Sequence, residues 1–239
     1  MPGTLIDPDA QPDGHPIPID AAEDAAIDAP PDAFVDASLV AHWKFDDAPE
    51  NGAFDSSGRG HTAACVGACP MVVAGKHGNG YRFDDALDHA LLVPDHPDFR
   101  GPFTIAAWML ADRVDRSQAI LSKPHGTGNG NSWQLEIVGA SSLLSFSGGS
   151  PHSLDSTSIT VPGTWYHVAG AWDGATKRLY VNGALVVTRV SEILYDNYPI
   201  VLGGDVNTGV PALHWDGILD DLRIYNRALS LAEIQALAN

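Results

Sequence analysis

Residues 165–187 read WYHVAGAWDGATKRLYVNGALVV, in which three apolar-rich runs are joined by two short turns. The first turn, DGATK, contains a glycine, and the second consists of Asn182 and Gly183 alone. An Asn-Gly pair between β-branched runs strongly favours a hairpin, because a type I′ turn requires positive φ at both central residues. The segment is therefore predicted to form a three-stranded antiparallel meander.

Short apolar runs of the same character occur along most of the chain after residue 38. Alternating apolar and polar residues predict a strand that begins at Leu39, and a longer apolar run predicts another over residues 103–110. Further strands are predicted at residues 81–83, 91–93, 117–122, 133–138, 143–146, 200–202 and 217–225. Gly, Pro, Asn and Asp cluster between these runs, and no helical pattern separates them. This arrangement predicts an all-β fold, an antiparallel β-sandwich or jelly roll.

One short helix is predicted at the C-terminal end of the chain. Ser230 is a suitable N-cap residue, and Glu233, three positions later, completes the pattern of a capping box. Leu231, Ile234 and Leu237 then form an apolar stripe on one side of the predicted helix.

The first 38 residues differ in composition from the rest of the chain. They contain eight Asp, one Glu and no Lys or Arg, together with seven of the 17 Pro. Asp recurs every fourth residue from position 20 to 36, but Pro30 and Pro31 interrupt any helix there, and like charges four residues apart repel. Residues 1–38 are therefore predicted to be an extended or disordered acidic linker, and residues 39–239 the folded domain. A Ca²⁺-binding Asp array is the alternative, although the segment lacks the glycines and ligand geometry that such arrays use.

The formal net charge of −17 argues against nucleic acid as a partner, because an acidic chain repels a phosphate backbone. No apolar run approaches the roughly 18 residues that a membrane span requires, so no membrane span is predicted. No secretory signal is recognisable after Met1. Such a segment is removed on export, so this observation does not place the protein in the cytosol.

Three separated motifs resemble one known family: the meander, the upstream run FTIAAWM and the C-terminal stretch GILDDLRIYNRALSLAEIQAL. Together they resemble the laminin G-like jelly rolls of the concanavalin A-like lectin/glucanase superfamily, and the resemblance covers residues 39–239. That superfamily includes sugar binders, adhesion modules and enzymes, so the fold alone does not define the function.

The expected function is a non-catalytic recognition or adhesion module, carbohydrate-binding, on a secreted or cell-surface protein. Its partner would be a glycan or an extracellular protein, and the acidic linker would tether it. A structural or protein-contact domain and a polysaccharide-active enzyme are the two alternatives.

The distribution of carboxylates argues against the enzyme. Glycoside hydrolysis usually needs two carboxylates about 5–10 Å apart. The resemblance implies that a catalytic member would carry Glu and Asp alternating along one strand, and none of the five Glu has a carboxylate two positions away. Glu136 is the only Glu inside a predicted strand, and it is isolated there. No G-x-S-x-G motif supports a serine hydrolase. No catalytic residue is therefore predicted.

The segment FDDAPENGAFDSSGRGH, residues 45–61, combines acidic residues and glycines after the first predicted strand. Ca²⁺ takes six to eight oxygen ligands, and a glycine-rich turn lets carbonyl groups point inward. The jelly rolls that this chain resembles often hold a structural Ca²⁺ between such a loop and an Asp of the last strand. The resemblance therefore implies the ligands Asp46 or Asp47, Asp55, carbonyl groups around Gly58 and His61, and Asp220.

Two points about this metal site stay open. Strand alternation places Asp47 on the same face as Trp43 and Phe45, but it does not decide between Asp46 and Asp47. An ordinary Asx turn at Asp55 is the alternative to a metal site. His61 is expected to offer its carbonyl group rather than to bind zinc, because no second His or Cys lies at zinc spacing.

Cys65 and Cys69 are the only two cysteines, and Gly67 lies between them. A glycine-containing turn allows the Cα separation that a disulfide needs. A zinc or redox site would need C-x-x-C spacing or further ligands, and neither is present. The secreted setting implied by the resemblance favours the disulfide.

Two of the six Trp are candidates for ligand contact. Trp43, Trp108, Trp165 and Trp172 lie in strand patterns and are expected in the core. Trp133 and Trp215 instead stand beside polar residues near loops, and glycan sites combine an aromatic ring with amides or carboxylates. The candidate ligand-binding residues are therefore Asn131, Trp133, Tyr195, Asn197, Tyr198, His214 and Trp215. Packing of the two Trp rings at the edge of the sandwich is the alternative.

Overall fold

The hairpin predicted at Asn182 and Gly183 is present in the computed structural model of the chain. Both residues have positive φ, 48° and 76°, as a type I′ turn requires. The turn joins β13 (Thr176–Val181) to β14 (Ala184–Val190), and β13 pairs antiparallel with β12 (Trp165–Trp172) on its other side. The predicted meander is therefore confirmed.

The structure describes residues 36–49, 52–126, 130–149, 153–207 and 209–239. The linker predicted for residues 1–38 lies outside these ranges except for its last three residues. Residues Ala37–Asn239 form one structural unit.

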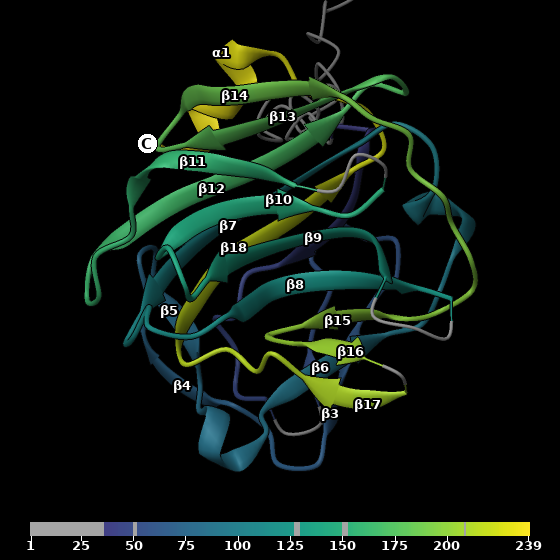
Figure 1. Cartoon of the computed structure of the whole chain (residues 1–239). Helices are drawn as coiled ribbons and strands as arrows, with labels where there is room; N and C mark the ends of the chain where they lie inside the picture. Colours follow the sequence, from purple (N-terminus) through teal and green to yellow (C-terminus); the bar gives the residue numbers. More distant parts are fainter. Residues whose placement is uncertain (1–35, 50–51, 127–129, 150–152, 208) are drawn as a thin grey trace, which may run out of the picture. The chain divides into compact units, whose positions relative to one another are not determined.

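The strands of the described residues form two eight-stranded antiparallel sheets and one separate two-stranded ribbon (Figure 1). The first sheet has the order β14, β13, β12, β7 (Phe103–Ala111), β18 (Gly217–Tyr225), β5 (Asn79–Phe83) and β4 (Met71–Ala74), and β1 (Leu39–Trp43) also pairs with β18. The second sheet has the order β11 (Leu154–Ile159), β10 (Leu143–Ser147), β9 (Gly130–Val138), β8 (Gln118–His125), β15 (Ile200–Leu202), β6 (Ala90–Val93), β3 (Ala63–Val66) and β2 (Gly52–Ala53). The ribbon consists of β16 (Asp205–Asn207) and β17 (Val210–Ala212).

The core lies between the two sheets, and alternation along each strand decides which side chains enter it. In β9, Trp133, Leu135 and Ile137 belong to the main core cluster, whereas Gln134 and Glu136 point to the opposite, outer face. Burial of one large apolar side chain stabilises the fold by about 1.5–3 kcal/mol. The core therefore fixes which face of the second sheet carries its polar side chains.

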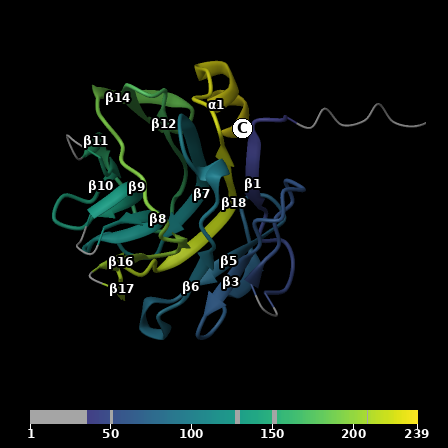
Figure 2. The same cartoon turned by 90° about the vertical axis from the view of Figure 1, so that its right-hand side faces the viewer.

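The predicted C-terminal helix is α1 (Leu231–Leu237), and its capping box is present. Ser230 Oγ accepts a hydrogen bond from the Glu233 N–H, and Glu233 Oε2 accepts one from the Ser230 N–H. Ile234 packs in a second apolar cluster with Ala106, Ala169, Tyr180 and Tyr225 on the outer face of the first sheet. Figure 2 shows α1 and β1 on one side of the molecule and β8, β9 and β10 on the other. None of the described helices is long and apolar enough to cross a membrane.

Several elements were not predicted from the sequence. The strands β2, β3, β4, β11, β16 and β17 are two to six residues long, and their sequences show little apolar alternation. Two 3₁₀ helices, η2 (Asp85–Leu87) and η3 (Pro97–Phe99), flank β6. β1 ends at Trp43, and Phe45 has a φ of 58°, which breaks the alternation of side chains after the strand.

Candidate functional site

A polar groove lies on the outer face of the second sheet, beside the β16–β17 ribbon. Its volume is about 490 Å³. Strand β9 contributes the side chains of Gln134 and Glu136, and β16 contributes Asp205. The complete lining is Gly130, Asn131, Gln134, Glu136, Ser147, Gly148, Asp205, Asn207 and Leu213.

A chain of hydrogen bonds orders the side chains in this groove. Asn131 Nδ2 donates to Gln134 Oε1 at 2.5 Å and to Asp205 Oδ2 at 3.1 Å. Gln134 Nε2 in turn donates to Glu136 Oε2 at 3.3 Å. Two carboxylates are thus connected through two amides, so the groove presents a fixed row of polar groups.

Two acceptor atoms of the groove have no partner among the described residues. These are Asn131 Oδ1 and Asp205 Oδ1, and both atoms are buried. A buried acceptor without a partner costs about 1–3 kcal/mol, so the site favours a ligand that brings hydrogen-bond donors. Hydroxyl groups are suitable donors for both atoms.

Glu136 has an altered affinity for protons. Burial raises the pKa of this carboxyl above its ordinary value, and the negative charges of Asp205 and Asp155 act in the same direction, against a hydrogen bond from Ser147. The carboxyl therefore takes up a proton more readily than an exposed Glu does.

Gly148 keeps the backbone at the edge of the groove close to β9. Its φ is 95°, and a Cβ at this position would lie 2.6 Å from the carbonyl oxygen of Ser132. Only glycine combines this conformation with so close an approach.

Of the predicted ligand-binding residues, Asn131 lines the groove, but the two Trp rings do not. Trp133 and Trp215 are 1% and 0% exposed and belong to the core between the sheets. The expectation that these rings stack on a sugar is corrected accordingly, because neither ring presents a face to solvent. The packing alternative describes both of them.

The other four predicted residues lie away from the groove. Tyr195 donates its hydroxyl hydrogen to the Gly101 carbonyl oxygen at 2.9 Å, and the Tyr198 carbonyl accepts a hydrogen bond from buried Lys123. Asn197 lies exposed between them in the same connection. His214 Nε2 is 3.5 Å from Asp88. The structure therefore does not gather the predicted ligand-binding residues into one site.

Four groove residues were not among the predicted ligand-binding residues: Gln134, Glu136, Ser147 and Asp205. Polar residues on alternate positions of WQLEIV are the one sequence signal that could have indicated Gln134 and Glu136 together. Asp205 carries no such signal, because its strand has only three residues.

A second cavity, of about 390 Å³, lies on the first sheet near the end of α1. Asp46 and Asp220 both line it, with Asp221 beside them. Asp221 has a φ of 50° in a β-bulge of β18, and the bulge directs two consecutive carboxylates to one cavity. The complete lining is His42, Lys44, Asp46, His77, Gly78, Asp220, Asp221, Arg223, Ala236, Leu237 and Asn239.

Asp220 is 1% exposed, and one of its two carboxylate oxygens accepts hydrogen bonds from backbone amides. Its Oδ2 atom accepts hydrogen bonds from the N–H groups of Lys76 and His77 at 2.7 and 2.8 Å. Its Oδ1 atom is buried without a partner in the described part of the chain. Burial raises the pKa of Asp220 to about 6, against the two amide hydrogen bonds and with the Asp221 charge adding to the rise. Asp46 Oδ1 accepts the Asn79 N–H at 3.0 Å, so one loop contacts both carboxylates.

The predicted metal ligand Asp55 lies elsewhere and is fully hydrogen-bonded. Its two oxygens accept hydrogen bonds from the backbone N–H groups of His42, Ser57 and His61 and from the Ser57 hydroxyl, at 2.8–2.9 Å. Although burial acts to raise it, these hydrogen bonds hold the pKa of Asp55 below its ordinary value. Asp55 thus organises its own loop, as the Asx-turn alternative describes.

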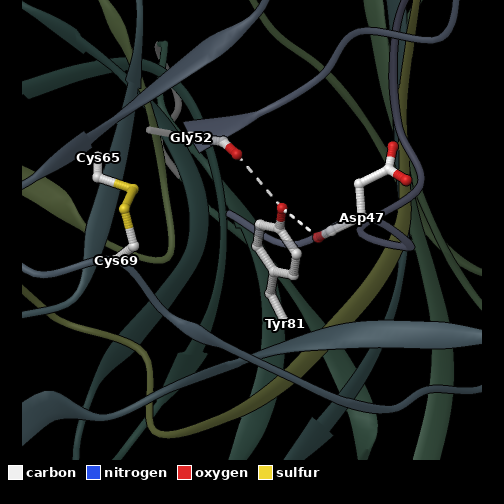
Figure 3. Close-up of a disulfide and its surroundings, with 5 residues drawn as sticks. All are labelled: Asp47, Gly52, Cys65, Cys69 and Tyr81. Carbon is white, nitrogen blue, oxygen red and sulfur yellow. Dashed lines mark hydrogen bonds between the residues drawn. A yellow bond between two sulfur atoms is a disulfide. The ribbon is translucent and has the colours of Figure 1, made fainter. Parts of the chain in front are cut away.

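The other predicted metal ligands, Gly58, His61 and Asp47, also lie outside the cavity of Asp46 and Asp220. Gly58 has a φ of 81° beside open space, and the carbonyl oxygen of His61 accepts a hydrogen bond from Trp43 Nε1 at 2.8 Å. Asp47 does not line the cavity that holds Asp46 and Asp220. Its carbonyl oxygen instead accepts a hydrogen bond from the Tyr81 hydroxyl, as Figure 3 shows. The structure therefore groups Asp46 with Asp220 and separates both from Asp55, Gly58 and His61.

The predicted disulfide between Cys65 and Cys69 is present (Figure 3). The two Cα atoms are 5.2 Å apart, within the normal range for a disulfide. The bond closes a loop between β3 and β4, close to the Tyr81 hydroxyl, which hydrogen-bonds to the carbonyl oxygens of Asp47 and Gly52.

With this geometry established, the comparisons define the family. The model of the concanavalin A-like lectin/glucanases superfamily named Laminin_G_3 matches residues 84–235, more than half of the chain. The chain belongs to this family, as its sequence motifs predicted. A comparison with curated protein sequences finds no match.

Solved structures share the fold. The binding domain of paraclostridial mosquitocidal protein 1 is similar with a TM-score of 0.67 and 18% identity, over 86% of this chain and 52% of that one. Domain 4 of AbnA, an extracellular arabinanase of Geobacillus stearothermophilus, was solved with arabinotriose and is similar with a TM-score of 0.64 and 21% identity, over 84% and 98%. A sialidase of Trypanosoma rangeli is similar with a TM-score of 0.67 and 18% identity, over 84% and 32%. The chain thus spans about half of the first structure and a third of the sialidase.

Proposed function

We propose that this protein is a non-catalytic carbohydrate-recognition module whose ligand occupies the groove beside β16 and β17. The observation that carries the proposal is the pair of buried acceptors, Asn131 Oδ1 and Asp205 Oδ1, on two residues that line a groove of about 490 Å³. Sugar hydroxyls would supply the donors that these two atoms lack. The similarity to an arabinanase domain that was solved with arabinotriose supports the same class of ligand.

The charge of the groove favours neutral glycans over anionic ones. Glu136 and Asp205 both line it, and the described lining contains neither Lys nor Arg. An anionic sugar would therefore meet like charge without a compensating cation. A neutral pentose or hexose oligosaccharide fits this arrangement.

Isothermal titration with arabinotriose, and a glycan array that contains neutral and sialylated oligosaccharides, test this proposal. We expect binding to neutral glycans only, and we expect Asp205→Asn to weaken it at least tenfold. Asp88→Asn is the matched control, because it removes the same charge at a side chain that is 79% exposed outside the groove. The absence of any neutral ligand across the array would favour a structural or protein-contact domain instead.

A polysaccharide-active enzyme is a second candidate, and one observation favours it. Glu136 has a raised pKa and shares its groove with the carboxylate of Asp205, and glycosidases use such pairs as acid and base or nucleophile. Release of reducing ends from mixed polysaccharides, lost in Glu136→Gln, would establish this function. Binding without any such release would support the non-catalytic module.

We also propose that Asp46 and Asp220 hold a structural Ca²⁺ in the cavity next to α1. The buried Asp220 Oδ1 atom without a described partner fits an oxygen-seeking cation, and Asp46 lines the same cavity. The ion would neutralise the charge of Asp220, whereas Asp221 is already paired with Arg223 at 2.8 Å. Thermal unfolding in Ca²⁺ and in chelator tests the site: we expect a higher Tm in Ca²⁺ for the natural chain and no shift for Asp220→Asn.

Display outside the cell is part of the same proposal. A disulfide such as Cys65–Cys69 persists mainly in oxidising compartments, which supports secretion or surface attachment. Protease accessibility of the domain on intact cells of the source organism tests this placement.

A further inference from the structure

We infer that His61, His96 and Asp98 form a binding site for a divalent transition-metal ion such as Zn²⁺. Each residue offers one ligand atom, and these atoms lie within 4.8 Å of one another. In the described residues, this is the one group of three or more His, Cys, Asp or Glu that meets this criterion. The site lies apart from both the groove and the cavity of Asp46 and Asp220.

The Asp98 carboxylate lies between the two imidazoles and faces each of them with a different oxygen. His61 Nε2 lies 3.3 Å from Asp98 Oδ2, and His96 Nδ1 lies 3.4 Å from Asp98 Oδ1. Zinc bonds to nitrogen and oxygen are about 2.0–2.1 Å long, so tetrahedral neighbours stand roughly 3.3 Å apart. Ligand atoms that lie within 4.8 Å of one another would therefore move closer together to bind an ion.

His61 is held in place before any ion binds. Its N–H donates to Asp55 Oδ2, and its carbonyl oxygen accepts from Trp43 Nε1, both at 2.8 Å. Its ring packs against the buried ring of Phe99, with centroids 4.6 Å apart. The backbone and ring of this ligand are thus ordered by contacts on three sides, which reduces the entropy lost on binding.

The other two ligands belong to the start of η3, on the solvent side. The His96 side chain is 50% exposed and that of Asp98 is 28% exposed, so an ion can reach them from solution. His96 Nδ1 now accepts the Asp98 N–H at 3.3 Å, which is long for a hydrogen bond. Metal binding would replace this weak contact with a coordinate bond.

The donor set selects the class of ion. Two imidazole nitrogens and one carboxylate suit zinc, nickel or cobalt, whereas Ca²⁺ needs six to eight oxygens. Three protein ligands leave a fourth position for water or for an external group. The ion would join the 54–61 loop to η3. In the sequence the loop precedes β6 and η3 follows it.

The test measures Zn²⁺ binding by titration calorimetry and Co²⁺ binding by visible absorption, on the tag-free chain of 239 residues after treatment with chelator. We expect one ion per chain at this site, an absorption band typical of tetrahedral Co²⁺, and a Tm that rises with Zn²⁺ concentration. His96→Gln and Asp98→Asn should each weaken Zn²⁺ binding at least tenfold. Both side chains are partly exposed, so their metal-free Tm should stay close to that of the natural chain.

His125→Gln is the matched control, because this histidine ends β8 and lies outside the cluster. It should leave Zn²⁺ binding unchanged. The inference is overturned if the natural chain shows no Zn²⁺ binding at 100 µM, or if His96→Gln and Asp98→Asn bind as tightly as it does. In that event the three side chains form only a hydrogen-bonded His–Asp–His contact.

Discussion

The Asp55 Oδ1 atom accepts a hydrogen bond of 2.9 Å from the backbone N–H of His42, which fastens the 54–61 loop to β1. The same carboxylate accepts three further hydrogen bonds from Ser57 and His61. One side chain therefore satisfies three backbone amides that would otherwise lack partners, and it does so at 2% exposure.

Asp55→Ala should lower the free energy of unfolding by about 3–5 kcal/mol, because it leaves buried amides unpaired. Urea denaturation in chelator measures this loss. Asp47→Ala is the control, since it removes an exposed carboxylate nearby and should change stability by less than about 0.5 kcal/mol. A loss below 1 kcal/mol for Asp55→Ala would show that the loop does not depend on this carboxylate.

Asp220→Asn should stabilise the metal-free protein at pH 7. The folded-state pKa of Asp220 is about 6, whereas its ordinary value is 3.8. Between these two pH values the folded chain therefore binds a proton that the unfolded chain has released. Stability therefore falls as pH rises from about 4 to 6, and the cost at pH 7 is up to about 3 kcal/mol. The free energy of unfolding of both chains, measured in chelator at pH 4.5 and 7, should differ mainly at pH 7. An equal difference at both pH values would contradict this account.

His167→Gln should remove a pH dependence of stability that has the opposite sign to that of Asp220. His167 lies 2% exposed in β12, and burial, with the positive charge of Arg223 adding, lowers its pKa from 6.5 to about 4. Its contribution to stability is complete above pH 6.5 and is lost as the pH falls through 4. At pH 5 the loss amounts to about 2 kcal/mol relative to pH 8. Chemical denaturation at these two pH values measures the free energy of unfolding of both chains. The difference between the natural chain and the variant should change by this amount from pH 8 to pH 5.

The titrations of Asp220 and His167 partly cancel between pH 5 and 7. The natural chain should therefore show a flatter stability profile in chelator than either single variant. A variant profile as flat as the natural one would contradict the assigned pKa shift of that residue.

Loss of the disulfide should cost only about 2 kcal/mol, because the cross-link between Cys65 and Cys69 closes a loop with a sequence separation of 4. The double variant Cys65→Ser, Cys69→Ser should keep the fold and lose a few degrees of Tm. Circular dichroism of the variant, and of the natural chain with and without reductant, measures this. A loss of the whole fold on reduction would show that the bond supports more than its own loop.

Local signals in the sequence were enough to predict much of the sandwich. The Asn182-Gly183 turn defines its hairpin through the φ values that only such a pair adopts easily. The capping box of Ser230 and Glu233 likewise depends on residues three positions apart. Strands β15 and β18 match their predicted ranges, because bordering Gly and polar residues mark their ends.

The candidate sites could not be predicted in this way, because they combine residues that are distant in the sequence. Asp205 meets Asn131 through a three-residue strand that has no readable period. His61 meets His96 and Asp98 only after β3 and β6 have paired. Alternation left the choice between Asp46 and Asp47 open, and the positive φ of Phe45 breaks that alternation before Asp46, which lines the cavity of Asp220. Trp133 has polar neighbours in sequence, but strand alternation turns its ring into the core.

The chain enters the folded unit at Leu39, opposite Tyr225 in the first sheet, whereas the groove opens from the outer face of the second sheet. Figure 2 shows the two layers with β1 and the groove strands on opposite sides. The start of β1 and the groove therefore belong to different sheets of the sandwich. A polymer bound in the groove would contact the second sheet and leave the start of β1 uncovered.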